Sequence, residues 1–182
     1  MSNPRIRRPR VFISYVRENE TQVRPLVEAL KGQGIDVWWD QENLEPAKLW
    51  PDVIDTAISK GNFFMACFSQ EYQKRTEDID GTYMNKELDI ALRKMRRLSP
   101  NRTWLIPVVL SECQLPLIPV APGSTLRDLQ YIDLSTPGQW EKGVKSIVDI
   151  IKSTRTIPGT SYLFRRQIEY GVPRIPLNTE KG

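Results

Sequence analysis

A run of six consecutive apolar residues, Phe63 to Phe68, is the feature that most constrains how this chain folds. A strand with one wet face alternates apolar and polar residues, whereas a run without alternation is typical of a parallel strand buried on both faces. Such a strand needs helices on both sides of its sheet. We therefore expect residues 63–68 to form the middle strand of a parallel sheet that lies between two helical layers.

Segments on either side of this run alternate between the two-residue period of strands and the 3.6-residue period of helices. The pattern predicts an α/β protein with a flavodoxin-like, doubly wound sheet of five parallel strands and helices on both faces. Residues 69–81 are expected to be a polar connection. The other predicted strands are 10–15, 35–39, 103–110 and 129–134, and the predicted helices include the segments 23–32, 51–61, 83–97 and 139–151.

The chain contains no histidine, which excludes several classes of chemistry. Ser-His-Asp and Cys-His nucleophilic systems, His-ligated metals and imidazole pH switches all need that side chain. Two cysteines, Cys67 and Cys113, cannot by themselves fill a four-ligand zinc site or build a disulfide scaffold. We expect no metal site, and we assign neither cysteine a role. Any catalysis must rely on carboxylate, lysine, tyrosine, cysteine or backbone groups.

Charge divides the chain into a body and two basic ends. The net charge is +4, yet residues 11–150 hold 16 basic and 20 acidic side chains. A face that binds nucleic acid gathers its Lys and Arg on the folded surface, so no nucleic acid is expected. We divide the chain into a basic arm at 1–8, a folded domain at 9–153 and an extension at 154–182. The apolar residues of the extension favour packing on the body, and the alternative is docking of a partner.

The sequence also lacks signals for a membrane and for common phosphate sites. It has no apolar stretch of membrane-spanning length, and its first ten residues are too polar for the core of a signal peptide, so a cytoplasmic protein is expected. No G-x-G-x-x-G follows the first predicted strand, and no G-x-x-x-x-G-K-[ST] occurs. A phosphate-accepting receiver domain would need an aspartate where this chain has Ser69.

Six short motifs occur in order along the body: VFISY at 11–15, VWWD at 37–40, LEPAKLW at 44–50, FSQEY at 68–72, NKEL at 85–88 and LIPVV at 105–109. Their order and spacing resemble those of a TIR (Toll/interleukin-1 receptor) domain, with the closest similarity to the bacterial branch. The resemblance covers about residues 9–153. Because TIR domains include both NAD-cleaving enzymes and non-enzymatic assembly modules, the family alone does not decide the function.

The resemblance implies that Glu87 is the catalytic residue. It stands on the third predicted helix, at the position of the catalytic glutamate of NAD-cleaving TIR domains. Helical spacing leaves Glu87 and Tyr83 together on the flank of the buried stripe, where both can face one ligand. The alternative is a solvated glutamate that pairs with Arg93 or Lys94. The predicted buried stripe consists of Met84, Leu88, Ala91 and Met95.

The same resemblance implies a substrate-binding set of Tyr15, Arg17, Asp40, Trp50 and Tyr83. Arg17 would meet the pyrophosphate, and its alternative is a solvated loop charge. Residues 40–50 correspond to the loop that gates the cleft and contacts a neighbouring protomer. Trp50 would stack on nicotinamide or adenine, or instead fix the start of the next helix. Two departures, an alanine after the loop proline and Tyr83 where relatives often have Trp, would lower or redirect activity.

One carboxylate suffices for the implied reaction because nicotinamide leaves NAD+ as a neutral base that needs no general acid. The carboxylate then stabilises the positive charge that develops on the ribose. The resemblance implies release of nicotinamide with ADP-ribose or a cyclic isomer, with NAD+ as substrate and no cofactor. It also implies antiphage defence and activation by TIR-TIR assembly, with a possible activating partner at 154–182. The alternatives are a non-enzymatic adaptor or virulence factor and, more distantly, a nucleoside-processing glycosyl transferase.

Overall fold

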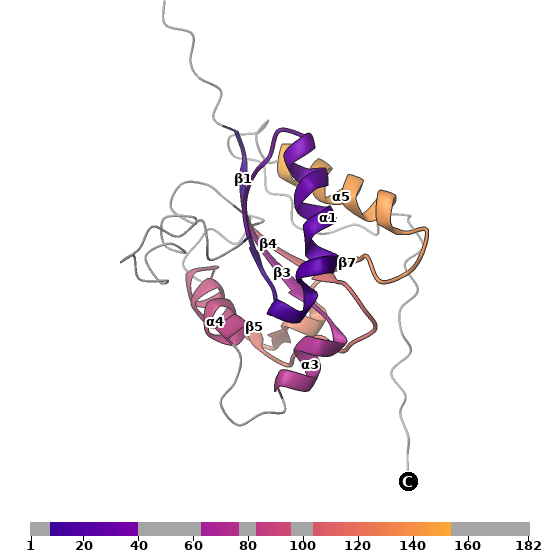
Figure 1. Ribbon diagram of the computed structural model, residues 1–182. Helices are drawn as coiled ribbons and strands as arrows, with labels where there is room; N and C mark the ends of the chain where they lie inside the picture. The colour runs from indigo at the N-terminus through magenta and orange to yellow at the C-terminus, as the bar shows by residue number, and fades with distance from the viewer. Residues whose placement is uncertain (1–7, 40–62, 77–82, 96–103, 154–182) are drawn as a thin grey trace, which may run out of the picture.

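The computed structural model describes residues 8–39, 63–76, 83–95 and 104–153, with a parallel sheet at its centre (Figure 1). The strands of this sheet are β1 (Arg10–Ser14), β2 (Asp36–Trp38), β3 (Phe63–Phe68), β4 (Leu105–Val109) and β7 (Ile132–Asp133). Their spatial order is β2-β1-β3-β4-β7, and each neighbouring pair is parallel. The predicted doubly wound sheet of five parallel strands is confirmed.

Strand β3 is the centre of the sheet, as its apolar run predicts. It pairs with β1 on one side and β4 on the other, and all six of its residues are buried. Alternate side chains of β3 enter two different clusters: Phe63, Met65 and Cys67 point to one face, and Phe64, Ala66 and Phe68 point to the other. Both faces therefore need a cover of apolar side chains.

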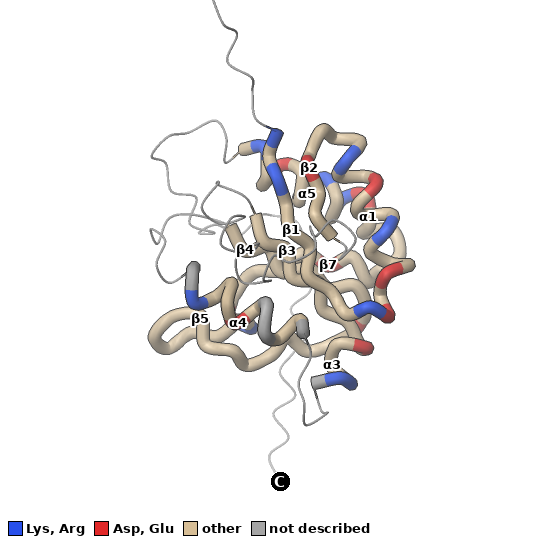
Figure 2. The backbone as a smooth tube through the Cα atoms, turned by 60° about the vertical axis from the view of Figure 1, so that its left-hand side comes forward, with Lys and Arg blue, Asp and Glu red and all other residues tan. Residues whose placement is uncertain are grey.

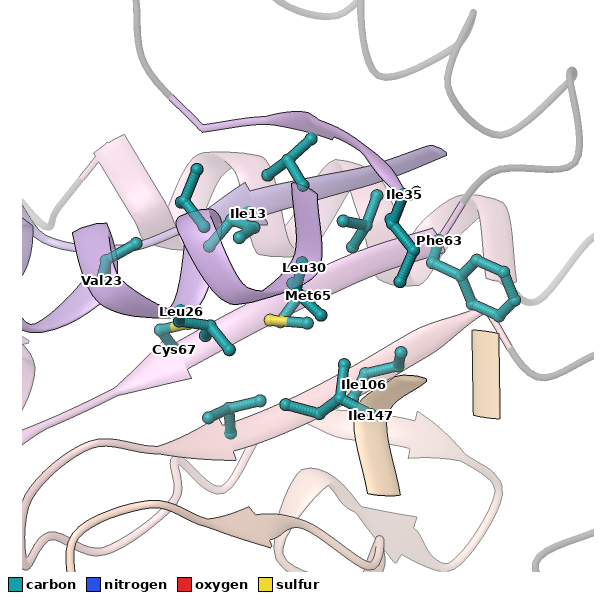
Figure 3. Packing of buried hydrophobic residues seen from close by; sticks show 14 of the residues in the cluster. Ile13, Val23, Leu26, Leu30, Ile35, Phe63, Met65, Cys67, Ile106 and Ile147 are labelled. Atoms are coloured by element: carbon teal, nitrogen blue, oxygen red, sulfur yellow. The ribbon is translucent and has the colours of Figure 1, made fainter. Parts of the chain in front are cut away.

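Helices α1 (Glu20–Gly32) and α5 (Trp140–Ser153) cover the first face. The predicted stripe of α1 is fully buried against β1 and β3, and Figure 3 shows three of its side chains beside Met65 and Cys67. The chain leaves α1 through Gly34, whose φ of 77° is a left-handed conformation that glycine adopts without steric cost. The buried α1 stripe is Val23, Leu26, Val27 and Leu30.

Helix α4 (Tyr83–Met95) packs in the cluster on the second face. Met84, Leu88 and Ala91 are buried as predicted, whereas the Met95 side chain lies outside the described residues. Aromatic rings form much of this cluster: Phe64 stacks on Phe12 with ring centroids 5.5 Å apart and meets Trp104 edge to face at 5.7 Å. The sheet is therefore held between two separate apolar layers.

A helix that the sequence did not predict follows β3. Residues 69–81 were expected to be a polar connection, but α3 (Gln70–Thr76) forms at once. The Ser69 hydroxyl accepts the Tyr72 backbone N–H at 3.0 Å, which is the geometry of a helix N-cap. Tyr72 is 2% exposed and packs edge to face on Phe68. One cap and one buried aromatic side chain therefore order a segment whose composition is otherwise polar.

The strand predicted at 129–134 was too long, because only β7 pairs with the main sheet. The chain before it forms an antiparallel pair of short strands, β5 (Pro119–Ala121) and β6 (Ser124–Thr125), and a 3₁₀ turn, η3 (Leu126–Asp128). Val120 and Leu126 anchor this unpredicted hairpin in the second apolar cluster. The predicted helix 51–61, most of the 1–8 arm and the 154–182 extension lie outside the described residues.

Charge and hydropathy on the described surface are mixed. Glu20, Arg24, Glu28 and Lys31 alternate in sign along α1, and Figure 2 shows acidic and basic residues interspersed along this helix. No described helix is both long and apolar enough to cross a membrane.

Two glycines in helices test the packing of the first face. A Cβ on Gly143 would overlap the side chain of Leu134 and lie 3.2 Å from Ile132 Cγ2, whereas a Cβ on Gly32 would meet nothing within 4 Å. We expect Gly143→Ala to lower the free energy of unfolding by about 1–3 kcal/mol through overpacking. Gly32→Ala, the matched control, should raise it by about 0.5–1 kcal/mol. Urea unfolding followed by circular dichroism measures both, and equal effects would contradict the packing.

Candidate functional site

The candidate site lies at the carboxyl edge of the sheet, where β1 and β3 are neighbours. The chain leaves β1 towards α1 on the first face, and it leaves β3 towards α4 on the second face. Connections that depart to opposite faces open a crevice outside the strand ends, which is where doubly wound proteins bind ligands. Polar groups at this edge are therefore the first candidates for function.

A polar hub, defined as Asn19, Gln22, Ser69 and Glu71, joins the two loops at this edge. Asn19 ends η1 (Arg17–Asn19) and is 1% exposed, and Ser69 follows β3 and is 0% exposed. The Ser69 hydroxyl donates to Asn19 Oδ1 at 2.6 Å. Asn19 Nδ2 donates in turn to Gln22 Oε1 at 2.7 Å and to Glu71 Oε2 at 3.0 Å. Both the Nδ2 and the Oδ1 of Asn19 thus have hydrogen-bond partners inside the protein.

These hydrogen bonds also determine the electrostatics of Glu71. The hydrogen bond from Asn19 is the largest contribution that lowers the Glu71 pKa below its usual range, and a backbone hydrogen bond lowers it further. Both favour the carboxylate over the neutral acid. Arg75 on α3 also reaches back to η1 and donates through Nε to Glu18 Oε1 at 2.8 Å. Helix α3 and the loop after β1 are therefore held as one unit.

Helix α4 is fastened to the same edge. The Tyr72 hydroxyl on α3 donates to Asn85 Oδ1 at 2.6 Å, and Asn85 lies in the first turn of α4. Burial raises the Tyr72 pKa, so this hydroxyl keeps its proton at neutral pH. The predicted catalytic residue, Glu87, lies two positions further along α4. The backbone that carries Glu87 thus starts from a fixed point at the carboxyl edge.

Two predicted binding residues, Tyr15 and Arg17, lie directly after β1. Tyr15 packs against the first apolar cluster, and its ring stacks on Trp39 with centroids 6.1 Å apart and an interplanar angle of 23°. Arg24 covers the other ring of this pair, with Cζ 5.2 Å from the Trp39 centroid. Arg17 is exposed in η1. The ring of Tyr15 is held between neighbours, whereas Arg17 is accessible to a ligand.

Some of the predicted site residues lie close together in the structure, and others lie outside the described residues. Tyr15, Arg17 and the start of α4 share the carboxyl edge, although Tyr15 packs on the α1 face and α4 covers the opposite face. The side chains of Glu87 and Tyr83 lie outside the described residues, as do Asp40 and Trp50. That these residues line one cleft stays a prediction.

Neither cysteine has the properties of a nucleophile. Cys67 is fully buried in the first cluster, and burial raises its pKa to about 12. Burial is also the main cause that raises the Cys113 pKa to about 11, with further contributions from the charges of Glu71 and Asp133. Both thiols are therefore protonated at neutral pH. Among the described residues, no group of three or more His, Cys, Asp or Glu is placed to hold a metal.

Sequence reasoning missed the polar hub, although a usable signal was present. Asn19 and Ser69 each belong to a polar segment that comes directly after a buried strand, and carboxyl ends of neighbouring parallel strands meet at one edge. The contact between them depends on strand order, which a single sequence pattern does not state.

A family model for the TIR domain matches residues 11–148. The chain belongs to the TIR domain family. The predicted family is thereby confirmed, and the solved relatives described next share the predicted fold.

Known proteins resemble this chain to different extents. A 62-residue segment is 34% identical to the NAD(+) hydrolase TcpC of Escherichia coli O6:H1 (strain CFT073), and the match spans 34% of this chain but 20% of that protein. The TIR domain of the Toll-related receptor TRR-2 from Hydra magnipapillata superposes with a TM-score of 0.54 at 21% identity, over 80% of this chain and 97% of that one. The TIR domains of the activated Roq1 resistosome give 0.52 at 18% identity, over 78% and 98%.

The polar hub predicts a pH-dependent defect for Asn19→Asp. The new carboxylate would still accept from Ser69, but it would face Glu71, so like charges replace a hydrogen bond. We expect a loss of about 2–4 kcal/mol of unfolding free energy at pH 7. The repulsion raises the carboxyl pKa values in the folded state above their unfolded values, so the variant should regain stability as pH falls from 7 to 4.

Gln22, the exposed hydrogen-bond partner of Asn19, supplies the control for the Asn19→Asp experiment. Gln22→Ala removes an acceptor that water can replace and should change stability by about 0.5 kcal/mol or less at either pH. Thermal unfolding at several pH values measures all three proteins. A defect in Asn19→Asp that stays constant from pH 7 to 4 would show that charge repulsion with Glu71 is not its cause.

Proposed function

We propose that this TIR domain cleaves NAD+ at the bond between nicotinamide and ribose, and releases nicotinamide with ADP-ribose or a cyclic isomer. NAD+ is the substrate in this proposal, and no resident cofactor is required. The observation that carries it is the local identity to a protein named as an NAD(+) hydrolase, combined with family membership over residues 11–148. The relative is matched over 20% of its length, so its activity enters here as a proposal.

The described scaffold suits a catalytic carboxylate at position 87. Electrostatic stabilisation of a developing cation is effective when the charged group is held in place before the reaction. The Tyr72 to Asn85 hydrogen bond fixes the first turn of α4, and Leu88, next to Glu87, is fully buried. In the proposed reaction Glu87 stabilises the ribose cation, and water or an adenine nitrogen captures it.

The remaining predicted residues take binding roles in this proposal. Arg17 is exposed and offers a cation for the pyrophosphate, while Tyr15 presents a ring that Trp39 holds in position. Asp40, Trp50 and Tyr83 complete the binding set by their positions in the family motifs. That all of these residues line one cleft is part of the proposal.

We further propose that the enzyme is cytoplasmic, serves bacterial antiphage defence and becomes active on assembly. TIR domains commonly self-associate, and the solved relatives include the TIR domains of an activated resistosome. Contacts through residues 40–50 would complete the site across protomers. An activating partner would bind the 154–182 extension, and nucleic acid has no role in this proposal.

The second candidate function is a non-enzymatic module that acts by TIR-TIR contacts as an adaptor or virulence factor. Two sequence features favour it: Ala47 follows the loop proline where relatives often have glycine, and Tyr83 replaces a frequent tryptophan. The two candidates make opposite predictions for turnover by concentrated protein.

Substitution of the proposed catalytic carboxylate is the direct test. Glu87→Gln keeps the size of the side chain and removes its charge, so nicotinamide release should fall by about two to three orders of magnitude. Glu28→Gln, at an exposed position of α1, is the matched control and should keep wild-type activity. Chromatography of the products separates ADP-ribose from a cyclic isomer. Equal turnover in the two variants, with the fold of both intact, would remove Glu87 from the mechanism.

If the enzyme becomes active on assembly, its activity should depend nonlinearly on protein concentration. If the site is completed between protomers, nicotinamide release per protein molecule should rise with concentration in parallel with the mass measured by light scattering. Free nucleosides, the substrates of the glycosyl transferase alternative, should not be processed. No NAD+ turnover by protein that has visibly assembled would favour the non-enzymatic module.

A further inference from the structure

A shallow, open pocket of about 360 Å³ lies on the α1 and α5 side of the sheet, away from α4. Its volume is at the lower end of the range of small-molecule sites. The floor is formed by Leu110 and Leu134, which follow β4 and β7 and are nearly buried. The pocket therefore opens at the carboxyl edge, as ligand sites of doubly wound sheets do. Its lining is Gln22, Pro25, Leu110, Leu134, Ser135 and Trp140.

The lining is neutral, and it combines an aromatic wall with an apolar floor. Trp140 begins α5, is half-buried against the first apolar cluster and supplies an indole to the pocket. No Lys, Arg, Asp or Glu is among the described residues that line it. An ion that enters such a site loses hydration without gaining a partner charge, whereas a flat neutral ring gains a stacking surface.

Two polar side chains give the pocket a defined hydrogen-bonding pattern. Gln22 Oε1 already accepts from Asn19 Nδ2, so its Nε2 remains a donor without a partner among the described residues. The Ser135 hydroxyl donates to Asp133 Oδ1 at 2.5 Å, which leaves its oxygen lone pairs as acceptors. The same Asp133 oxygen accepts the Ser135 backbone N–H at 2.7 Å and fixes this turn. The pocket thus presents one donor and one acceptor.

We propose that this pocket is a second ligand site, which binds a neutral, planar nitrogen heterocycle whose edge carries both an acceptor and a donor, as a free nucleobase or an aromatic carboxamide does. The ring stacks on Trp140 above Leu110 and Leu134. Its acceptor meets Gln22 Nε2, and its donor meets Ser135 Oγ. All of the lining residues of this site are described by the structure, and the site does not depend on whether the protein cleaves NAD+.

The test measures binding to the full-length chain by nuclear magnetic resonance. The readout is the indole N–H resonance of Trp140, identified as the one that is lost in Trp140→Phe. Nicotinamide and adenine are the probes, and nicotinate, which has a carboxylate in place of the amide, is the charged control. We expect a saturable shift with both neutral probes and at least tenfold weaker binding of nicotinate. No saturable shift, or equal binding of nicotinate and nicotinamide, would overturn the proposal.

Variants locate the site independently of the proposed catalytic centre. In Trp140→Ala, binding of adenine measured by calorimetry should weaken roughly tenfold or more through loss of stacking, while Trp140→Phe should retain most of the affinity. Gln22→Glu keeps the acceptor for Asn19 but loses the donor to the ligand, so it should weaken nicotinamide binding, and circular dichroism checks that the added charge near Glu71 leaves the fold intact. Unchanged affinity in both Trp140→Ala and Gln22→Glu would place the ligand elsewhere and refute the assignment.

Discussion

The hydrogen bond from Ser69 to Asn19 is the interaction on which the organisation of the candidate site depends. Both residues are almost completely buried, and an unpaired polar group there would cost about 1–3 kcal/mol. The bond closes only if the loops after β1 and β3 stay side by side. Because the same Ser69 hydroxyl caps α3, and α3 holds α4 through Tyr72 and Asn85, one buried contact helps to determine where α4 begins.

The molecule consists of a rigid scaffold around the sheet and of exposed side chains at its carboxyl edge. The two apolar layers hold β3 from both sides, so the ends of the strands cannot shift without disturbing a core. The stack of Tyr15, Trp39 and Arg24 extends that rigidity to the loop after β1. Arg17, by contrast, remains exposed. A rigid frame beside an accessible cation is the division of roles that the proposed pyrophosphate contact of Arg17 requires.

Patterns within one element were readable from the sequence, and contacts between distant elements were not. The apolar run of β3 and the stripe of α1 follow from burial of a single strand or helix face, so both were predicted. Helix α3 was missed because its stability comes from the Ser69 cap and from Tyr72, which is buried only after the sheet has formed. The family motifs pointed to position 87, but no local pattern showed that Asn85 would be tied to Tyr72.

The polar hub is coupled to the proposed second pocket through one side chain. Gln22 belongs to the hub, since its Oε1 accepts from Asn19, and it also lines the proposed second pocket. A ligand that takes the Nε2 donor holds the amide in the orientation that Asn19 already requires, so the coupling is positive in sign. One exposed hydrogen bond is worth about 0.5–1.5 kcal/mol, so the effect is roughly tenfold at most. Because the coupling is reciprocal, a change that strengthens the hydrogen bond from Asn19 to Gln22 should strengthen ligand binding in the second pocket by the same factor.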